Sequence, residues 1–412
     1  MAPYDDCNVI TDDLTDLVKV DTTINEFESM SGAILSRSKK CKVFGFGSWR
    51  GKTDWPLTYI QTVQEIKIFG VFINDSYRSL LKRNWDFRFQ KFAACINSWS
   101  SRFFPSLMSK VEVVKTFGLS RIYYIASILP MNSSMVLKIE SLIGKFIWKG
   151  GGWPLRVALA EVKNRLHNGG LNLVCVASMC NSLLTSQFLR LLKSSDSKAK
   201  MHVNSWIGDS LSDLVPWFGQ CDLAKNIPDY YCHIESLIIV GKIDDLVTTD
   251  KWQRITNKVL YSEQCKNFLL PKVQLDAGNS MDYNMAWKRI SLPVLSSGVR
   301  DISYMLLHNK LPTKERLHRV GLGSDPFCPE CPGSPLCNVE HYFCLCLRVQ
   351  NVWPKVRNIL TDLIGEDIPN FKLLNYNMRW SSWENEAVWL LGNYVSRAWS
   401  IMSSGILRVS KI

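Results

Sequence analysis

The segment from residue 326 to residue 346 constrains the fold more than any other part of the sequence. It contains Cys328, Cys331, His341 and Cys346, and loop-forming residues stand among them: Pro326, Pro329, Pro332, Gly333 and Pro335. Such a loop needs a metal ion, rather than an apolar core, to hold it. A Cys-x-x-Cys turn presents two thiolates to one ion, and zinc prefers four soft or borderline ligands in a tetrahedron. The pattern therefore predicts a zinc site with these four ligands, of the closed kind that is structural and not catalytic.

Two further thiols leave the ligand set open by one residue. Cys337 lies inside the same stretch, and Cys344 precedes Cys346 by only two positions, so that its side chain can point into the core instead. An accidental cluster is the other alternative, because the chain has 13 cysteines.

Length and composition predict a folded protein inside the cell. The chain has 412 residues, enough for about two or three domains, and its apolar content is 46%. No stretch reaches the roughly 18 to 20 uninterrupted apolar residues of a membrane span. The first residues carry no secretory signal, and the cysteines are scattered and odd in number. We therefore expect free thiols, no membrane partner, and a nuclear or cytoplasmic protein.

The positive charge is concentrated in one segment. The formal net charge is +12, and residues 66–165 hold 16 Lys or Arg against five Asp or Glu. A basic surface of this size is typical of proteins that bind the phosphate backbone of RNA or DNA. A solvated basic face without a partner is the alternative.

Periodicity predicts an α+β fold that is mainly α-helical. In the first 75 residues we expect a short strand at 7–11, a helix ending at Gly32, and strands in KCKVFGF (40–46) and IKIFGVFI (66–73). Apolar residues then recur at three- or four-residue spacing from Tyr77 to Ile96, which predicts a helix. Further helices are expected over 111–129, over 134–148, and, with a buried face, over 173–193.

In the second half of the sequence the hydrophobic periodicity is weak, except in the C-terminal tail. Several short elements are expected over 196–265, and two helices from Met285 to about Val320, separated by Pro293 and Pro312. The tail from 383 to 404 is predicted to be an amphipathic helix. Its apolar face would consist of Val388, Leu391, Val395, Trp399 and Met402.

The cysteine-rich segment resembles the zinc-binding module that follows the polymerase of non-LTR (LINE-type) retrotransposon reverse transcriptases. The matching residues are Leu311-Pro312-Thr313, Leu317, Arg319, Cys328, Cys331, Glu340-His341 and Cys346. Upstream, the stretches 66–73, 122–130 and 144–150 are similar to the sequence that connects the last palm strands to the thumb in these enzymes. Together the similar stretches span roughly two thirds of the chain, and residues 195–280 match nothing in the family.

The resemblance implies a division into four parts. These are a residual reverse-transcriptase palm (1–75), a helical thumb (76–150), a helical linker region (151–283), and the zinc-binding domain with C-terminal helices (284–412). In the family this part of the protein holds RNA and DNA during reverse transcription. Candidate contacts are Arg83, Arg88, Lys91, Lys115, Arg121, Lys145 and Lys149 in the basic helices, and Lys314, Arg316 and Arg319 beside the zinc module. Trp85, Trp99 and Trp148 could stack on bases, but their helical spacing favours the core.

The N-terminus is similar to the polymerase box in which two aspartates sit on a tight β-turn. On this match Asp5 and Asp6 would help to bind the two Mg²⁺ ions that activate the primer hydroxyl. Pro3 and Tyr4 depart from the family pattern, and the alternative is that both aspartates are ordinary solvated acids.

We expect no polymerase activity from this chain alone, because the printed sequence lacks the family's earlier aspartate-bearing strand and its fingers. Mg²⁺ would matter only if that core were complete. The expected function is nucleic-acid binding by the C-terminal part of such a polymerase, with a full-length polymerase as a further candidate partner. Two alternatives remain open: a fragment of an active enzyme with a misplaced start, and decayed transposon sequence without function.

Overall fold

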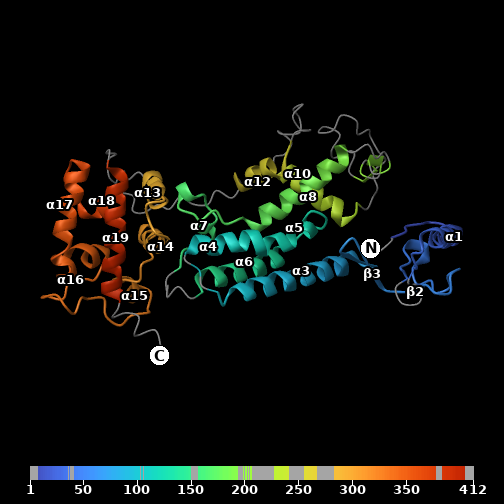
Figure 1. Cartoon of the computed structure of the whole chain (residues 1–412), viewed down its shortest axis with the longest axis horizontal. Helices are drawn as coiled ribbons and strands as arrows, with labels where there is room; N and C mark the ends of the chain where they lie inside the picture. The colour runs from blue at the N-terminus through green and yellow to red at the C-terminus, as the bar shows by residue number, and fades with distance from the viewer. Residues whose placement is uncertain are drawn as a thin grey trace.

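The computed structural model is an elongated, mainly helical molecule with a few short strands, which confirms the predicted α+β, mainly α class (Figure 1). It describes residues 8–35, 37, 41–102, 104, 106–149, 156–193, 198, 200–201, 203, 205–206, 227–240, 255–266, 283–376 and 383–403. The N-terminal helix and first strands lie at one end of the molecule, and the C-terminal helices lie at the other.

The described strands are β1 (Lys42–Val43), β2 (Gln61–Thr62), β3 (Glu65–Ile68) and β4 (Val71–Asn74). The α-helices of the first half are α1 (Leu14–Ser31), α3 (Tyr77–Trp99), α4 (Leu107–Val113), α5 (Ser120–Ala126), α6 (Ser133–Trp148), α7 (Leu159–Val162) and α8 (Val176–Lys193). Those of the second half are α10 (Asp229–Val240), α12 (Asn257–Lys266), α13 (Tyr283–Ile290), α14 (Ser297–Leu307), α15 (Lys314–Arg319), α16 (Leu347–Gln350), α17 (Trp353–Ile364), α18 (Asn370–Leu374) and α19 (Glu384–Ser403). Short 3-10 or π-helical turns are η1 (Gly47–Trp49), η2 (Val114–Leu119), η3 (Leu166–Asn168) and η5 (His341–Leu345). None of the described helices is both long and apolar enough to cross a bilayer.

The N-terminal part confirms one predicted element and corrects two. Helix α1 ends at Gly32, whose left-handed backbone (φ +70°) closes it as expected. The strand predicted at 7–11 is wrong over 8–11, because the Thr11 hydroxyl bonds to Asp13 and begins the cap of α1 instead. The single strand predicted over 66–73 is a hairpin, in which β3 pairs with β4 in antiparallel fashion. The chain reverses at Phe69 and Gly70, which both have positive φ.

The next helices lie close to their predicted positions. Helix α3 begins at the Ser76 cap, and its periodic face buries Trp85, Phe92 and Ile96. The helix predicted over 111–129 begins four residues earlier and ends at Ala126 as one stretch, made of α4, the π-helical η2 and α5. Helix α6 coincides with the predicted 134–148 to within one residue.

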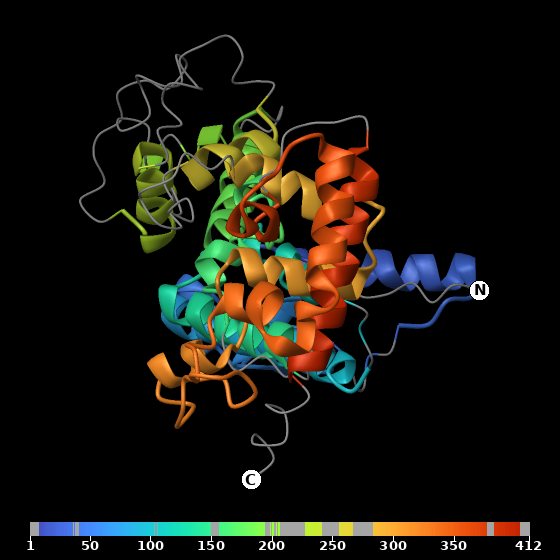
Figure 2. The ribbon, with the colours of Figure 1, turned by 90° about the vertical axis from the view of Figure 1, so that its left-hand side faces the viewer.

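One cluster of buried apolar side chains runs from α3 to α19 and joins the basic helices to the C-terminal helices. A second, smaller cluster lies among α8, α10 and α12. Seen from the C-terminal end, α17 and α19 pack side by side (Figure 2). Polar contacts also join the two halves of the described chain, and two of them involve α14 and its C-terminal cap. Both carboxylate oxygens of Asp301 accept from the Leu107 amide at 2.9 and 3.1 Å, and His308 Nε2 lies 2.7 Å from the Gly169 carbonyl oxygen.

Residues 285–320 contain one more helix than expected. Residues 285–320 form parts or all of three helices, α13, α14 and α15, because the chain breaks near both Pro293 and Pro312 and restarts at capping Ser296 and Thr313. The predicted apolar face of α19 is correct. Val388, Leu391, Val395 and Met402 are buried, and Trp399 is half-buried against the same core.

Candidate metal centre and nucleic-acid surface

The first two candidate metal ligands lie on a tight hairpin between α15 and η5. Phe327 and Leu336 form an isolated antiparallel bridge at its base. Cys328 follows directly and is buried, and Cys331 lies at the turn. The turn closes through Gly333, whose φ of +72° suits a residue without a side chain. The prolines and glycine of this segment therefore form the loop that the sequence predicts.

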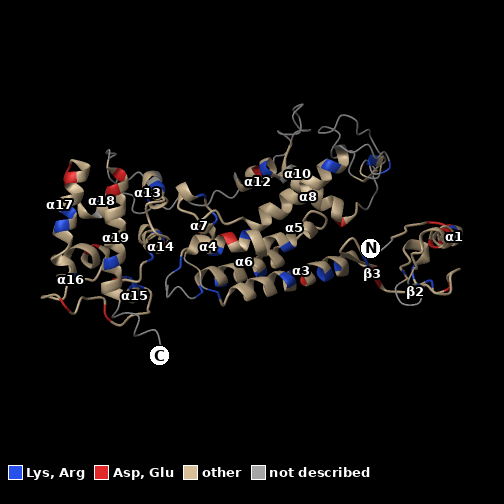
Figure 3. Cartoon of the chain, in the orientation of Figure 1, with Lys and Arg blue, Asp and Glu red and all other residues tan. Residues whose placement is uncertain are grey.

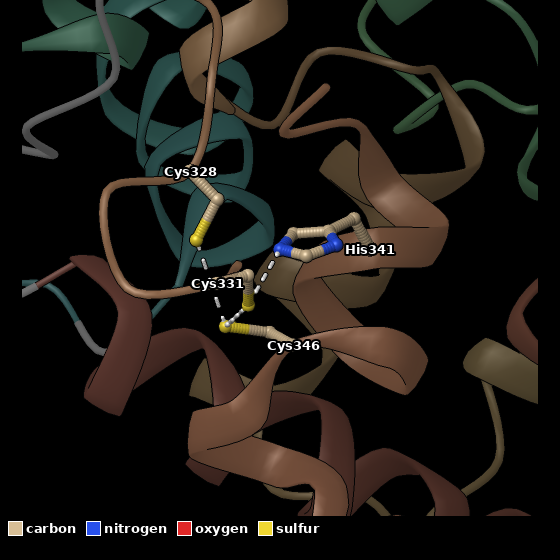
Figure 4. Close-up of side chains that lie close together, drawn as sticks. All are labelled: Cys328, Cys331, His341 and Cys346. Carbon is tan, nitrogen blue, oxygen red and sulfur yellow. Dashed lines mark hydrogen bonds between the residues drawn. The ribbon is translucent and has the colours of Figure 1, made fainter. Parts of the chain in front are cut away.

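The other two ligands lie at the two ends of the single turn η5. The His341 amide donates to the Asn338 side-chain oxygen at 2.8 Å, which fixes the start of this turn. The Cys346 amide donates to the His341 carbonyl oxygen at 2.9 Å, so that both side chains face the hairpin. Figure 4 shows the four side chains converging from the two segments.

The distances match the edges of a metal tetrahedron. Cys346 Sγ lies 3.9 Å from Cys328 Sγ and 3.8 Å from Cys331 Sγ, and Cys331 Sγ lies 3.6 Å from His341 Nε2. A tetrahedral zinc ion with ordinary bond lengths separates two sulfur ligands by about 3.8 Å and a sulfur from a nitrogen by about 3.6 Å. All four ligand atoms lie within 4.8 Å of one another. The cluster can therefore hold a metal ion such as zinc.

The surroundings of the cluster favour the ligand forms of Cys328, Cys331 and His341, whereas burial raises the pKa of the Cys346 thiol to about 12, so that a bound cation would be needed to hold its thiolate. Burial lowers the pKa of His341, so the ring is neutral and can offer a lone pair. Burial alone would raise the pKa of Cys328, but hydrogen bonds from the backbone of Glu330 and from neighbouring groups outweigh it and lower this pKa. The Leu347 amide lies 3.4 Å from Cys331 Sγ, where it can donate to a thiolate.

The two spare thiols lie outside the cluster. Cys337 is buried, is hydrogen-bonded to Tyr342, and has its pKa raised to about 12 by burial. Cys344 is buried in the main core, as its spacing from Cys346 allowed, and burial raises its pKa as well. Among the described residues, the metal-binding group consists of the four residues that the spacing predicts.

The predicted magnesium ligands cannot be placed. Asp5 and Asp6 lie outside the residues that the structure describes. Their role as metal ligands and the alternative of solvated acids both remain predictions.

Several Lys and Arg residues lie on α3 near the β3–β4 hairpin (Figure 3). Basic side chains of the hairpin and of α3 gather around two aromatic rings. Phe72 and Phe87 pack edge to face with their centroids 5.2 Å apart. Four cationic groups lie within 6.0 Å of one or both rings, namely Lys67, Arg83, Arg88 and Lys91. We call this set the basic cluster. Lys67 was not among the predicted contacts, because only the β3–β4 hairpin brings it next to α3.

Some of the predicted cationic contacts form ion pairs with carboxylates and others do not. Arg83, Lys115 and Arg319 form ion pairs with Glu65, Glu112 and Glu315 respectively. Arg121, Lys145 and Lys149 are exposed, and no ion pair is found for them within the described part of the chain.

Beside the hairpin that carries Cys328 and Cys331, two of the three candidate cations are less accessible to a partner. Lys314 Nζ donates to the Phe327 carbonyl oxygen at 3.3 Å and so ties α15 to the hairpin. Arg316 is half-buried, and its Nε lies in the interior without a hydrogen-bond partner in the described structure. Only Arg319 projects well into solvent, beside Glu315.

Two of the three tryptophans are core residues, as their spacing favoured. Trp85 is buried and donates to the Pro130 carbonyl oxygen at 2.7 Å, and Trp148 is buried in the same core. Trp99 is only half-buried.

No protein-family model matches the chain, and no curated protein is significantly similar to it. The resemblance to retrotransposon polymerases therefore stays a prediction. The structural features that bear on function are the four-residue Cys₃His cluster and the distribution of the basic residues.

Proposed function

We propose that this chain is a nucleic-acid-binding, C-terminal part of a non-LTR retrotransposon RNA-directed DNA polymerase, stabilised by a structural zinc ion and without polymerase activity on its own. The observation that carries the binding proposal is the convergence of Lys67, Arg83, Arg88 and Lys91 on the Phe72–Phe87 pair. The observation that supports the family is the Cys₃His cluster in a helical domain behind these basic helices.

The basic cluster suits a phosphate backbone for an electrostatic reason. Like charges repel, so several cations on one small surface raise the free energy of the unbound protein unless counterions gather there. A polyanion replaces those counterions and releases them, which makes its affinity fall steeply with salt. Glu65, paired with Arg83, is the one carboxylate that forms an ion pair with this cluster within the described residues.

The zinc module would supply a second contact. Its hairpin is tied to α15 through Lys314, and the exposed Arg319 lies at the end of that helix. The metal would act here only by holding the hairpin in shape, because a closed four-ligand site leaves no position for a substrate.

A salt titration tests the proposal. We would measure the affinity of the chain for fluorescein-labelled RNA, single-stranded DNA and duplex DNA by anisotropy, between 50 and about 200 mM salt. Lys67→Gln combined with Lys91→Gln should weaken binding to all three and reduce the salt slope by about 1.4 for single strands and about 1.8 for duplex. The matched control combines Lys19→Gln with Lys355→Gln, two exposed lysines on α1 and α17.

The outcomes separate the alternatives. An equal loss in the control pair, or salt-independent binding, would contradict a specific basic surface. Mg²⁺-dependent incorporation of nucleotides would instead support a fragment of an active polymerase. A chain without a cooperative unfolding transition would support decayed sequence.

A further inference from the structure

We propose that a row of aromatic and arginine side chains along α3 and the α4–α5 stretch binds single-stranded nucleic acid by stacking on its bases. This inference rests on the proposed function and names the kind of nucleic acid that the surface prefers. The members of this stacking row, from one end to the other, are Arg102, Trp99, Phe117, Arg121, Tyr124, Arg88 and Phe69.

The first end of the row is a stack of three groups. The Arg102 guanidinium lies 4.2 Å from the centre of the Trp99 ring. Phe117 lies against Trp99 with the two centroids 5.0 Å apart and the rings inclined by 32°. Phe117 nevertheless keeps 46% of its surface exposed. The stack therefore ends in the Phe117 ring, which packs against Trp99 and is partly open to solvent.

The middle of the row follows one helical stretch. Phe117, Arg121 and Tyr124 are separated by four and three residues, so they lie on successive turns of the same face. Arg121 is exposed, and 46% of Tyr124 is exposed. In the order of residues along this face, an exposed arginine thus lies between two exposed rings.

The far end is fixed by two hydrogen bonds to the β3–β4 turn. The Tyr124 hydroxyl donates to the Phe69 carbonyl oxygen, and Arg88 donates to the Gly70 carbonyl oxygen at 3.2 Å while its guanidinium lies 5.9 Å from the Tyr124 ring. Phe69 has a φ of +47° and is 77% exposed. A bulky side chain rarely adopts this backbone conformation. These contacts hold it there and leave its ring in water.

The composition of the row favours nucleic acid over a protein partner. Among the described residues of the basic segment 66–165, the exposed large hydrophobic side chains are Phe69, Phe117, Tyr124 and Leu137. Three of the four are aromatic and belong to the row. Every base has a π face that stacks on such rings, and arginines between the rings can contact phosphates.

Its length and openness favour a single strand over a duplex. Arg88 and Trp99 both lie on α3, and 11 residues of helix at 1.5 Å each separate their backbones by about 16 Å, with Arg102 just beyond the end of the helix. This distance accommodates several nucleotides. The bases of a duplex are already stacked on one another and cannot reach the rings, so a duplex would use the arginines alone.

The test compares nucleic acids with and without accessible bases. We would measure the anisotropy of labelled oligouridine, oligothymidine and a duplex hairpin with the chain and with Phe117→Ala combined with Tyr124→Ala. Alanine replacement of stacking rings weakens single-strand binding by about tenfold per ring. The double variant should therefore lose about 100-fold on both single strands and keep its duplex affinity. Phe27→Ala is the matched control, because that ring is 56% exposed on α1.

Each outcome decides the matter. Circular dichroism and thermal unfolding first show that the variants fold. A loss confined to oligouridine identifies RNA as the ligand, and a loss confined to oligothymidine identifies DNA. Equal losses on single strands and duplex, or no loss, overturn the stacking row while leaving the basic cluster and the proposed function intact. If the unaltered chain binds none of the three, both proposals fail.

Discussion

Asp301 should make the stability of the fold depend on pH in a direction opposite to that of most carboxylates. This residue lies on α14 and accepts from the Leu107 amide at the start of α4. Burial raises its pKa from 3.8 to about 7, although the Leu107 hydrogen bond and the nearby Lys110 and Arg300 favour the ionised form. Lys110 cannot approach freely, because its ammonium group already donates to the carbonyl oxygens at the end of α6.

The magnitude follows from linkage. Because the pKa is raised in the folded state, the stability that Asp301 contributes is fully present below pH 3.8 and is lost as pH rises through 7. A difference of about three pKa units corresponds to about 4 kcal/mol, and water at the partly exposed carboxyl makes this an upper bound. Asp301→Asn keeps the acceptor for the Leu107 amide and removes the charge. The free energy of unfolding of this variant, relative to the parent, should therefore rise by up to about 4 kcal/mol between pH 4 and pH 8.

Urea unfolding at a series of pH values measures this difference. Circular dichroism at 222 nm follows the helices, and comparison of the two proteins at each pH cancels every other group that titrates. A constant offset between them from pH 4 to pH 8 would refute the reasoning. It would show that the carboxyl is ionised throughout, with a pKa close to that of an exposed aspartate.

Other residues give shorter tests. Cys346→Ser should abolish the binding of about one zinc per chain, measured by elemental analysis, whereas Cys344→Ser should retain it. Burial lowers the pKa of His308 from 6.5 to about 4, so the parent should lose about 3 kcal/mol of stability as pH falls from 6.5 to 4, and His308→Gln should remove this loss in urea titrations. Gly169→Ala should lower the stability by at least about 2 kcal/mol, because φ is +78° and the new Cβ would lie 2.8 Å from a tryptophan ring. Gly144→Ala, with open space around it in α6, should instead stabilise the fold by about 0.5–1 kcal/mol in thermal unfolding.

Helices were predictable where one strong periodic pattern met a clear end. Helix α1 stops at Gly32 and α6 at Trp148, and the apolar face of α19 follows from its spacing alone. The hairpin at Phe69 was missed because no polar residue separates Ile68 from Val71, the ends of its two strands. The chain reverses there only through the positive φ angles of Phe69 and Gly70. The candidate metal ligands were predictable because their spacing is local and the loop around them has few apolar residues.

The stacking row was not predictable for the opposite reason. Phe69, Trp99 and Phe117 come from a hairpin and two helical stretches, and no periodicity relates them. In the sequence, Trp85 and Trp99 look alike, at comparable places in one helical pattern. The fold buries the first against Pro130 and leaves the second beneath an arginine at the surface. Which aromatic residues reach solvent is decided by tertiary packing, which the pattern of a single helix does not contain.

The metal cluster lies where a loop without a core meets a segment that has one. From 321 to 340 the buried residues are Cys328 and Cys337 alone, whereas every residue of 341–346 except Leu345 is buried. Burial of apolar side chains can therefore hold η5 in place but not the hairpin. A tetrahedral ion draws two ligands from each side, so it would transfer the rigidity of the helical core to the hairpin and, through Lys314, to α15. The metal ion would therefore replace a hydrophobic core for residues 321–340. For this reason the spacing of the candidate ligands, rather than an apolar pattern, predicts the structure of this segment.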